Sequence, residues 1–341
     1  MPGLLLDTLR GANTAQRPVW LMRQAGRYLP EYRALRAEKG GFLKLVYDSE
    51  AAAEITLQPI RRYGLDGAIL FSDILIVPYA MGQDLEFLVG EGPRLSPRLV
   101  DVALENLHAV PDRLSPIYAT VKRVKAMLPA DKTMLGFAGS PWTVATYMVA
   151  GEGSRDQHDT RAMAYRDPGA FQAIIDAITT VTIEYLGGQI LAGAEAVQLF
   201  DSWAGSLAPR EFERWVIAPN AAIVAALTAR YPHIPVIGFP KGAGEKLPAY
   251  ARETGVAALG LDETIDPVWA AQVLPAGLPV QGNLDPLLLI AGGAELERQT
   301  LRILDAFAGR PHIFNLGHGI GQTTPLKHVG ELLSLVRGWR A

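Results

Sequence analysis

Residues 133–143, TMLGFAGSPWT, carry the pattern that decides the fold. An apolar run leads into a Gly-Ser turn, and Pro141 then stands early in the next predicted helix, a position that proline favours. The same order recurs almost to the end of the chain, because short apolar runs alternate with longer helical patterns. Strands that are apolar throughout are typical of a parallel sheet covered by helices.

The whole chain divides into such strand–helix units. We predict strands at 18–22, 68–72, 133–137, 196–200, 235–239, 257–260, 279–281 and 312–315. We predict helices at 49–62, 114–128, 168–191, 209–230, 246–253, 267–273, 294–307 and 327–337. This order predicts an α/β fold, a single (β/α)8 (TIM) barrel over residues 1–341, because no linker or shift in composition divides the chain.

The composition narrows the class of protein. The chain has 341 residues, 49% of them hydrophobic and 20% charged, which suits one large buried core. It has no cysteine, and this excludes disulfides, thiolate metal sites and a cysteine nucleophile. The net charge of −3 argues against a nucleic-acid-binding surface. No apolar run is long enough to span a membrane, and no signal-peptide pattern begins the chain, so we expect a cytoplasmic location.

Positive charge gathers near the start of the chain. Residues 1–44 hold eight Lys or Arg and three Asp or Glu, a net of +5 that leaves −8 for the rest. A solvated surface is the ordinary explanation for such a stretch. However, Arg23 and Arg27 stand in a glycine-containing turn directly after an apolar run. A local basic pocket on an acidic protein suits a small polyanion better than a nucleic acid.

Polar residues follow the predicted strands one after another. In a barrel of this kind the active site lies at the carboxyl ends of the strands, so these residues predict one polar cleft there. They are Arg23, Asp73, Ser140, Asp201, Ser202, Lys241, Asp262, Asn283, Asp285 and His318.

Arg23, Arg27 and Asp73 are the strongest candidates for binding a substrate. Each guanidinium can form two hydrogen bonds to one carboxylate or phosphate, although pairing with Glu31 is an alternative. Asp73 follows a strongly apolar strand. It either caps the next helix or faces substrate N–H donors or a developing cation.

Three further residues leave their roles open. Tyr147 lies in the helix that begins near Pro141, where it either packs in the core or reaches the cleft. His318 stands between two glycines and could serve as an acid, a base or a hydrogen-bond donor. Lys241 suggests a Schiff-base lysine, but no acid–base partner is evident in the sequence. The histidines have no metal-ligand spacing, so we expect no metal site.

Taken together, these segments resemble the uroporphyrinogen decarboxylase family of haem and tetrapyrrole biosynthesis. The most specific match is MRQAGRYLPEYR at 22–33, which follows PVW at 18–20. Further matches occur in family order over essentially the whole chain: ILFSDI at 69–74, GSPWT at 139–143, TYM at 146–148, FDSWAG at 200–205, GLD at 260–262, QGNLDP at 281–286 and NLGHG at 315–319.

The resemblance implies a distorted barrel, a homodimer, and a reaction that needs no metal or organic cofactor. The reaction removes carbon dioxide from the four acetate arms of uroporphyrinogen III and gives coproporphyrinogen III. The family's substrate contacts would fall on Arg23, Gln24, Ala25, Gly26, Arg27, Phe42, Asp73, Tyr147, Ser202 and His318.

The chemistry of the reaction assigns Asp73 and Arg23 as catalytic residues. A pyrrole protonated on carbon takes up the electrons released by decarboxylation, so the protein must stabilise a cation, and Asp73 suits that role. Arg23 is a candidate acid, although a guanidinium is a poor proton donor. A substrate carboxyl group, a water molecule and His318 stay open as rivals.

The sequence leaves two alternative functions to weigh. One is a methyltransferase of the same barrel superfamily, whose members hold zinc with His and Cys, which this chain cannot supply because it has no cysteine. The other is a tetrapyrrole-binding protein that has the same cleft and performs no catalysis.

Overall fold

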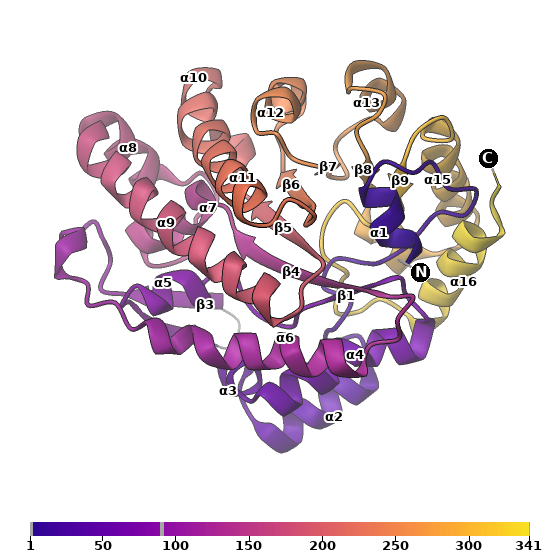
Figure 1. The fold of residues 1–341 in the computed structure, drawn as a ribbon, viewed down its shortest axis with the longest axis horizontal. Coiled ribbons are helices and arrows are strands. Elements are labelled where there is room, and N and C mark those ends of the chain that lie inside the picture. Colours follow the sequence, from indigo (N-terminus) through magenta and orange to yellow (C-terminus); the bar gives the residue numbers. More distant parts are fainter. Residues whose placement is uncertain (1–2, 89–91, 341) are drawn as a thin grey trace.

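The computed structural model describes residues 3–88 and 92–340, and its centre is a curled sheet of seven parallel strands (Figure 1). The strands lie in the order β1, β4, β5, β6, β7, β8, β9. They span Gly67–Ile69 (β1), Thr133–Gly139 (β4), Ala196–Asp201 (β5), Val236–Pro240 (β6), Ala258–Gly260 (β7), Val280–Gln281 (β8) and His312–Ile313 (β9). All seven overlap strands that the sequence predicts, and the barrel class is thereby confirmed.

The first predicted strand, at 18–22, is wrong as a regular strand. It is reduced to one parallel bridge between Val19 and Phe314. The Val19 carbonyl also accepts the Asp66 N–H at 2.9 Å, just before β1. This short segment therefore joins the two edge strands β1 and β9 and closes the sheet into a distorted barrel.

Side-chain amides explain why this strand is short. The N–H of Leu21 donates to Gln24 Oε1 at 3.0 Å, and the N–H of Met22 donates to Asn315 Oδ1 at 2.9 Å. A backbone donor that bonds to a side chain is not available for a β-ladder. The chain therefore leaves the sheet after Trp20 and turns into the loop that carries Arg23.

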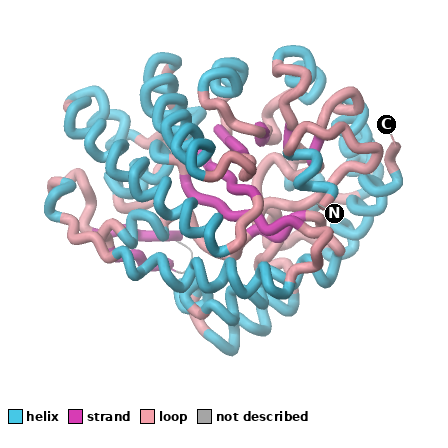
Figure 2. Tube along the Cα trace, viewed as in Figure 1, coloured by secondary structure: helices cyan, strands magenta, loops and turns pink. Residues whose placement is uncertain are grey.

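Helices surround the sheet (Figure 2), and most begin and end within a few residues of the prediction. They are Ser49–Tyr63 (α4), Ser115–Met127 (α6), Pro168–Ala192 (α9), Leu247–Glu253 (α12), Pro267–Val273 (α13), Gly293–Ala306 (α15) and Leu326–Gly338 (α16). The helix predicted at 209–230 is Pro209–Phe212 (α10), a π-helical segment Glu213–Ile217, and Ala218–Arg230 (α11).

Shorter helices and a hairpin lie between these strand–helix units. The sequence predicted only one of them, the helix that begins near Pro141. They are the helices Leu4–Leu9 (α1), Pro30–Lys39 (α2), Phe42–Tyr47 (α3), Ile76–Ala80 (α5), Pro141–Ala150 (α7), His158–Arg166 (α8) and Pro286–Ala291 (α14). A hairpin pairs Asp84–Leu88 (β2) with Gly92–Ser96 (β3). Short 3₁₀ turns occur at Leu104–Asn106, Pro111–Leu114, Ala204–Ser206 and Gly244–Lys246. α2 and α3 lie together below α4 in the view of Figure 1.

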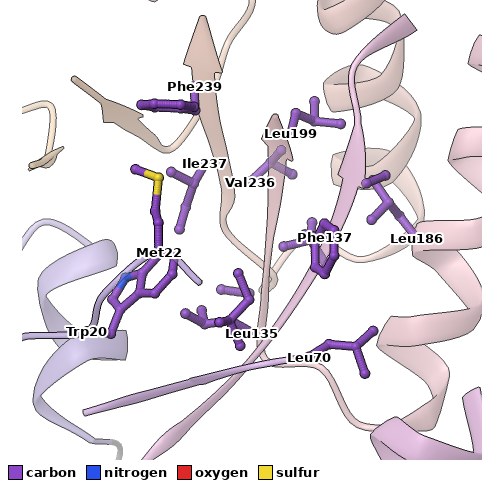
Figure 3. Close-up of a cluster of buried hydrophobic side chains, with 14 of the residues drawn as sticks. Trp20, Met22, Leu70, Leu135, Phe137, Leu186, Leu199, Val236, Ile237 and Phe239 are labelled. Atoms are coloured by element: carbon purple, nitrogen blue, oxygen red, sulfur yellow. The ribbon is translucent and has the colours of Figure 1, made fainter. Parts of the chain in front are cut away.

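Buried amides cross the interior of the barrel. Trp20 Nε1 donates to Gln281 Oε1 at 2.9 Å, and Gln281 Nε2 donates to Gln198 Oε1 at 3.1 Å. Figure 3 shows part of the cluster of buried apolar side chains to which Trp20 belongs, with Met22 and Ile237 among them. Because buried polar groups are costly when unpaired, this chain of bonds fixes the three side chains in one arrangement.

A layer of three aromatic rings lies next to these amides, toward the carboxyl ends of the strands. Phe200 contacts Phe137 and Phe239 edge to face, with ring centroids 5.6 and 5.8 Å apart. Phe137 and Phe239 are buried and Phe200 is half-buried. The layer therefore gives an apolar floor to the barrel mouth, by which we mean the end of the sheet where its strands finish.

No helix in the described part of the chain, residues 3–88 and 92–340, has both the length and the apolar character that a membrane span requires.

Candidate functional site

A tight turn at the barrel mouth presents Arg23. The N–H of Gln24 donates to the carbonyl of Leu21 at 2.9 Å, and Arg23 has a φ of +59°. Few residues other than glycine adopt this left-handed conformation, which costs of the order of 1 kcal/mol or more. Arg23 is exposed in this turn. The strained backbone of Arg23 therefore sets the direction in which its side chain leaves the turn.

Gln24 is fully buried, and among the described residues its side chain bonds only to backbone groups. Its Oε1 accepts the Leu21 N–H at 3.0 Å, and its Nε2 donates to the Gly67 carbonyl at 2.8 Å. The amide thus ties the Arg23 turn to the start of β1. Of the predicted site residues, Gln24 is therefore the one whose side chain is turned away from the mouth.

His318 lies between two close contacts that explain its flanking glycines. A Cβ atom on Gly317 would lie 2.1 Å from the backbone nitrogen of Glu263. A Cβ atom on Gly319 would lie 2.3 Å from Cδ of Arg23. Separations this short do not occur between real atoms, so a side chain at residue 317 would require the backbone of Glu263 to move, and one at residue 319 would displace the stem of Arg23. The loop therefore lies with His318 between Arg23 and Glu263.

The pKa of His318 is lowered to about 4. Burial is the main cause, and the positive charges of Arg23 and Lys241 add to it, while Asp262 opposes the shift. The imidazole is consequently neutral at neutral pH. A neutral imidazole can donate one hydrogen bond but does not carry the extra proton that an acid needs.

Asp73 is half-buried just after β1. Its Oδ1 accepts the N–H of Leu75 at 2.9 Å, which forms the turn before α5. Among the described residues no donor is bonded to its Oδ2. Burial raises the pKa of Asp73 to about 6, while the Leu75 hydrogen bond and the charge of Arg23 act in the opposite direction. Asp73 is therefore a partly accessible anion at neutral pH, and Leu75, not Asp73, is the N-cap of α5.

Tyr147 lies on α7 close to both charged groups. Burial is the main cause that raises the pKa of its hydroxyl; Trp203 opposes the shift, Asp73 adds to it and Arg23 opposes it. Its ring also lies against Gly153, where a Cβ atom would be 3.6 Å from the hydroxyl oxygen. Tyr147 is half-buried and packs against the core, and the interactions of its hydroxyl with Asp73 and Arg23 place that group near both of them.

Ser202 follows β5 in a turn that a buried carboxyl group organises. Thr143 Oγ1 donates to Asp201 Oδ1 at 2.5 Å and accepts the N–H of Trp203 at 3.1 Å. Burial raises the pKa of Asp201 to about 7, against hydrogen bonds from Thr143 and Asn220. The half-buried Ser202 is thus held between two residues that bond to the β4–α7 turn.

Phe42 completes an aromatic wall near Asp73. Its ring lies 5.4 Å from Phe71, two residues before Asp73, and 4.7 Å from Phe87. Ala25 and Gly26 are half-exposed in the turn between the two arginines. Phe42, Ala25 and Gly26 are thus partly accessible to solvent.

Arg27 lines a basic groove. The sequence indicated a basic pocket here only through the net positive charge of residues 1–44. The groove has a volume of about 700 Å³ and is also lined by Arg33 and Arg36. Arg27 Nη1 donates to Gln322 Oε1 at 3.1 Å. Among the described residues no carboxylate pairs with any of these three guanidiniums, because Glu31 instead binds Arg62 through two hydrogen bonds of 2.7 and 2.9 Å.

Lys241 has a partner that the sequence did not reveal. Its Nζ lies 3.6 Å from Oε1 of Glu263, which belongs to the loop after the next strand. The position of Lys241 after a strand was the signal for its place at the mouth. Within residues 3–88 and 92–340, no group of three or more His, Asp or Glu side chains could hold a metal ion.

The family model described as uroporphyrinogen decarboxylase (URO-D) matches residues 2–339. A uroporphyrinogen decarboxylase of Novosphingobium aromaticivorans is 77% identical over 339 residues, covering 99% of each chain. The chain belongs to the uroporphyrinogen decarboxylase family. A second member of this family, from Rhizorhabdus wittichii, is 71% identical over 334 residues, which is 98% of this chain and 97% of that protein. The resemblance found in the sequence is thereby confirmed.

The fold of this decarboxylase family extends to other barrels. A methyltransferase from Methanosarcina mazei matches 97% of this chain and 96% of its own, with a TM-score of 0.79 and 18% identity. At this level of identity the likeness concerns the fold alone.

Proposed function

We propose that this chain decarboxylates the four acetate arms of uroporphyrinogen III to give coproporphyrinogen III, with Asp73 as the group that stabilises the cationic intermediate. The observation that carries this proposal is the state of Asp73. It is a half-buried carboxylate at the mouth, with one oxygen fixed by Leu75 and no guanidinium bonded to it among the described residues.

The reaction needs such an anion for a simple electronic reason. Loss of carbon dioxide leaves an electron pair on the methylene carbon, and this pair forms an exocyclic C=C bond that neutralises the pyrrole protonated on carbon. The methylene carbon then takes up a proton and the ring carbon releases one, which gives the methyl arm and restores the pyrrole. The positive charge exists only in the intermediate and the transition states around it. An anion that faces the pyrrole N–H groups therefore stabilises these states more than the substrate, and this difference is what accelerates the reaction.

The other mouth residues bind the substrate in this proposal. Arg23 and Arg27 seat acetate and propionate carboxylates through charge-assisted hydrogen bonds. Phe42 and the aromatic floor contact the macrocycle, while Tyr147, Ser202 and His318 donate hydrogen bonds to its arms. Ala25 and Gly26 contribute backbone N–H groups, and Gln24 acts through the turn that it holds.

Two of the candidate proton donors are unsuitable under this proposal. Because its pKa is about 4, His318 is a hydrogen-bond donor and not the acid at neutral pH. Arg23 is also a poor proton donor, because a guanidinium stays charged in proteins. A substrate carboxyl group or a water molecule held beside Arg23 is the better source.

We further propose that residues 1–341 act as one domain in a cytoplasmic homodimer. The family model matches nearly the whole chain, which supports a single domain, and the homodimer is what the resemblance to the family implies. Light scattering after size exclusion tests it: a mass of twice 36.8 kDa is expected, and a mass of 36.8 kDa at micromolar concentration would contradict it.

One assay tests the function. The chain is incubated with uroporphyrinogen III without oxygen, and the products are separated by their number of carboxylates. Products with seven to four carboxylates are expected in turn. Asp73→Asn should lower turnover by about 10²–10³-fold, the range for a lost electrostatic stabiliser, while Asp131→Asn, at an exposed site paired with Lys132, should not. Binding without products would favour a tetrapyrrole-binding protein.

A further inference from the structure

Lys241 is a cation at the mouth that lies outside the family motifs and has no role in the proposed function. It follows β6, and its side chain is 30% exposed. Its Nζ–Oε1 distance to Glu263, 3.6 Å, exceeds that of a direct hydrogen bond. Such a loose, partly exposed pair contributes little to stability.

A second lysine from the same loop provides a contrast. Lys246 Nζ donates to the Leu207 carbonyl at 2.9 Å, and it lies 5.0 Å from the centre of the Phe212 ring. Lys246 is therefore anchored to the protein, whereas the ammonium of Lys241 is free to rotate. An ammonium has three donors, so Lys241 can keep Glu263 and bind another acceptor as well.

The position of Glu263 makes it the fixed member of the pair. Its backbone packs directly against Gly317, so it cannot shift without moving the His318 loop. Its Oε2 is buried and has no hydrogen-bond partner in the described part of the chain. The carboxylate thus holds the lysine stem near His318 without using all of the donors on Nζ.

Two positively charged side chains act on His318. Arg23 and Lys241 both lower the pKa of the imidazole. Arg23 lies against Gly319, and Glu263, the partner of Lys241, lies against Gly317. Arg23, on the segment between β9 and β1, His318 after β9 and Lys241 after β6 therefore bring three donors together at the mouth, and Asp73 after β1 lies near Arg23.

We propose that Lys241 is a further substrate-binding residue, which seats one carboxylate arm of the macrocycle on the side of His318 away from Arg23, with Glu263 as its counterion in the free protein. This inference rests on the proposed function, because it takes its ligand from that reaction. It predicts that the lysine contributes to binding an octacarboxylate and not to the chemical step.

The test uses uroporphyrin, the oxidised octacarboxylate macrocycle, because it cannot undergo the reaction. Its Kd is measured by fluorescence quenching for the wild type, Lys241→Met, Lys241→Arg and Lys327→Met. Loss of one charge-assisted hydrogen bond should raise the Kd of Lys241→Met about tenfold. Lys241→Arg should restore most of the affinity. Lys327→Met removes one charge from an exposed helix position and should leave the Kd unchanged.

Two more measurements separate a carboxylate contact from a structural role. The Kd of Lys241→Met should depend less steeply on salt concentration than that of the wild type. With uroporphyrinogen, KM should rise about tenfold while kcat stays within threefold. Glu263→Gln removes the competing anion and should lower the Kd by about two- to fivefold.

The inference is overturned if Lys241→Met binds uroporphyrin within twofold of the wild type, or if it loses kcat with KM unchanged. Should Lys241→Met not fold, Lys241→Gln replaces it and the same limits apply. The proposed function fails separately, since a wild-type chain that makes no coproporphyrinogen contradicts it whatever the Kd values are.

Discussion

Gly319 packs its Cα directly against the stem of Arg23, and a Cβ atom there would lie 2.3 Å from the arginine Cδ. This contact links the first loop of the mouth to the last one. The N–H of Ile320 also donates to the Met22 carbonyl at 2.9 Å, which holds the two loops side by side. The position of the Arg23 guanidinium therefore depends on the absence of a side chain at residue 319.

Gly319→Ala should displace Arg23 while the fold persists. Overpacking at one site costs about 1–3 kcal/mol, and the flexible arginine stem can move aside. We expect kcat/KM for uroporphyrinogen to fall about tenfold or more, with a folded circular-dichroism spectrum. Gly330→Ala, where a Cβ meets nothing within 4 Å, is the matched control and should keep full activity. Wild-type kinetics in Gly319→Ala would contradict this account of the loop.

The ionisation of Asp73 should set the acid limb of the pH–rate profile. Its pKa is raised to about 6, so its anionic form is lost as the pH falls through that value. The rate should then drop by about tenfold per pH unit below pH 6. His318, with a pKa of about 4, adds no change between pH 5 and 8. The limb should disappear in the residual activity of Asp73→Asn; if it persists there, another group produces it.

The same raised pKa predicts that Asp73 lowers the stability of the fold. A carboxyl group whose pKa rises from 3.8 to about 6 on folding favours the folded state when protonated, and this contribution is lost as the pH rises through 6. Asp73→Asn should therefore stabilise the fold at pH 8 by about 1–2 kcal/mol, and by about half of that at pH 5. Urea denaturation at both pH values measures it. A destabilised Asp73→Asn at pH 8 would show that the ionised carboxylate holds the fold together.

Much of this architecture could be predicted from the sequence, because apolar runs and helical patterns are local signals. The Arg23, Asp73 and His318 positions followed from their place after strands. What could not be predicted depends on contacts between distant segments. The strand at 18–22 is short because Asn315, far along the chain, takes the Met22 N–H.

Contacts between distant segments also decide the arrangement of the mouth, so the sequence could not predict them. Glu263 reaches Lys241 only when β6 and β7 lie side by side, so no spacing in the sequence announces the pair. The glycines around His318 were visible in the sequence. Their reason, close contact with Glu263 and with Arg23, is visible only in the fold.

Gln24 should act on stability as well as on the substrate site. Replacing it by leucine leaves the Leu21 N–H and the Gly67 carbonyl buried without partners. Each unsatisfied group costs about 1–3 kcal/mol, so Gln24→Leu should lower the free energy of unfolding by about 2–5 kcal/mol. Gln24→Glu keeps the acceptor for Leu21 and should separate the two bonds. A stability loss below 1 kcal/mol for Gln24→Leu, measured in urea, would mean that the turn does not depend on these bonds.

Arg27→Lys tests whether the substrate needs the shape of the guanidinium or only its charge. Arg27 holds Gln322 through one nitrogen, at 3.1 Å, which leaves its other donors for a ligand in the groove. Lysine keeps the charge but cannot form two parallel hydrogen bonds to one carboxylate. We expect KM for uroporphyrinogen to rise about three- to tenfold with kcat nearly unchanged, since seating an arm away from the reacting ring affects ground state and transition state alike. Arg252→Lys, at an exposed position on α12, serves as the control. An unchanged KM would mean that Arg27 acts as a point charge at the rim and that two-pronged binding occurs elsewhere in the mouth.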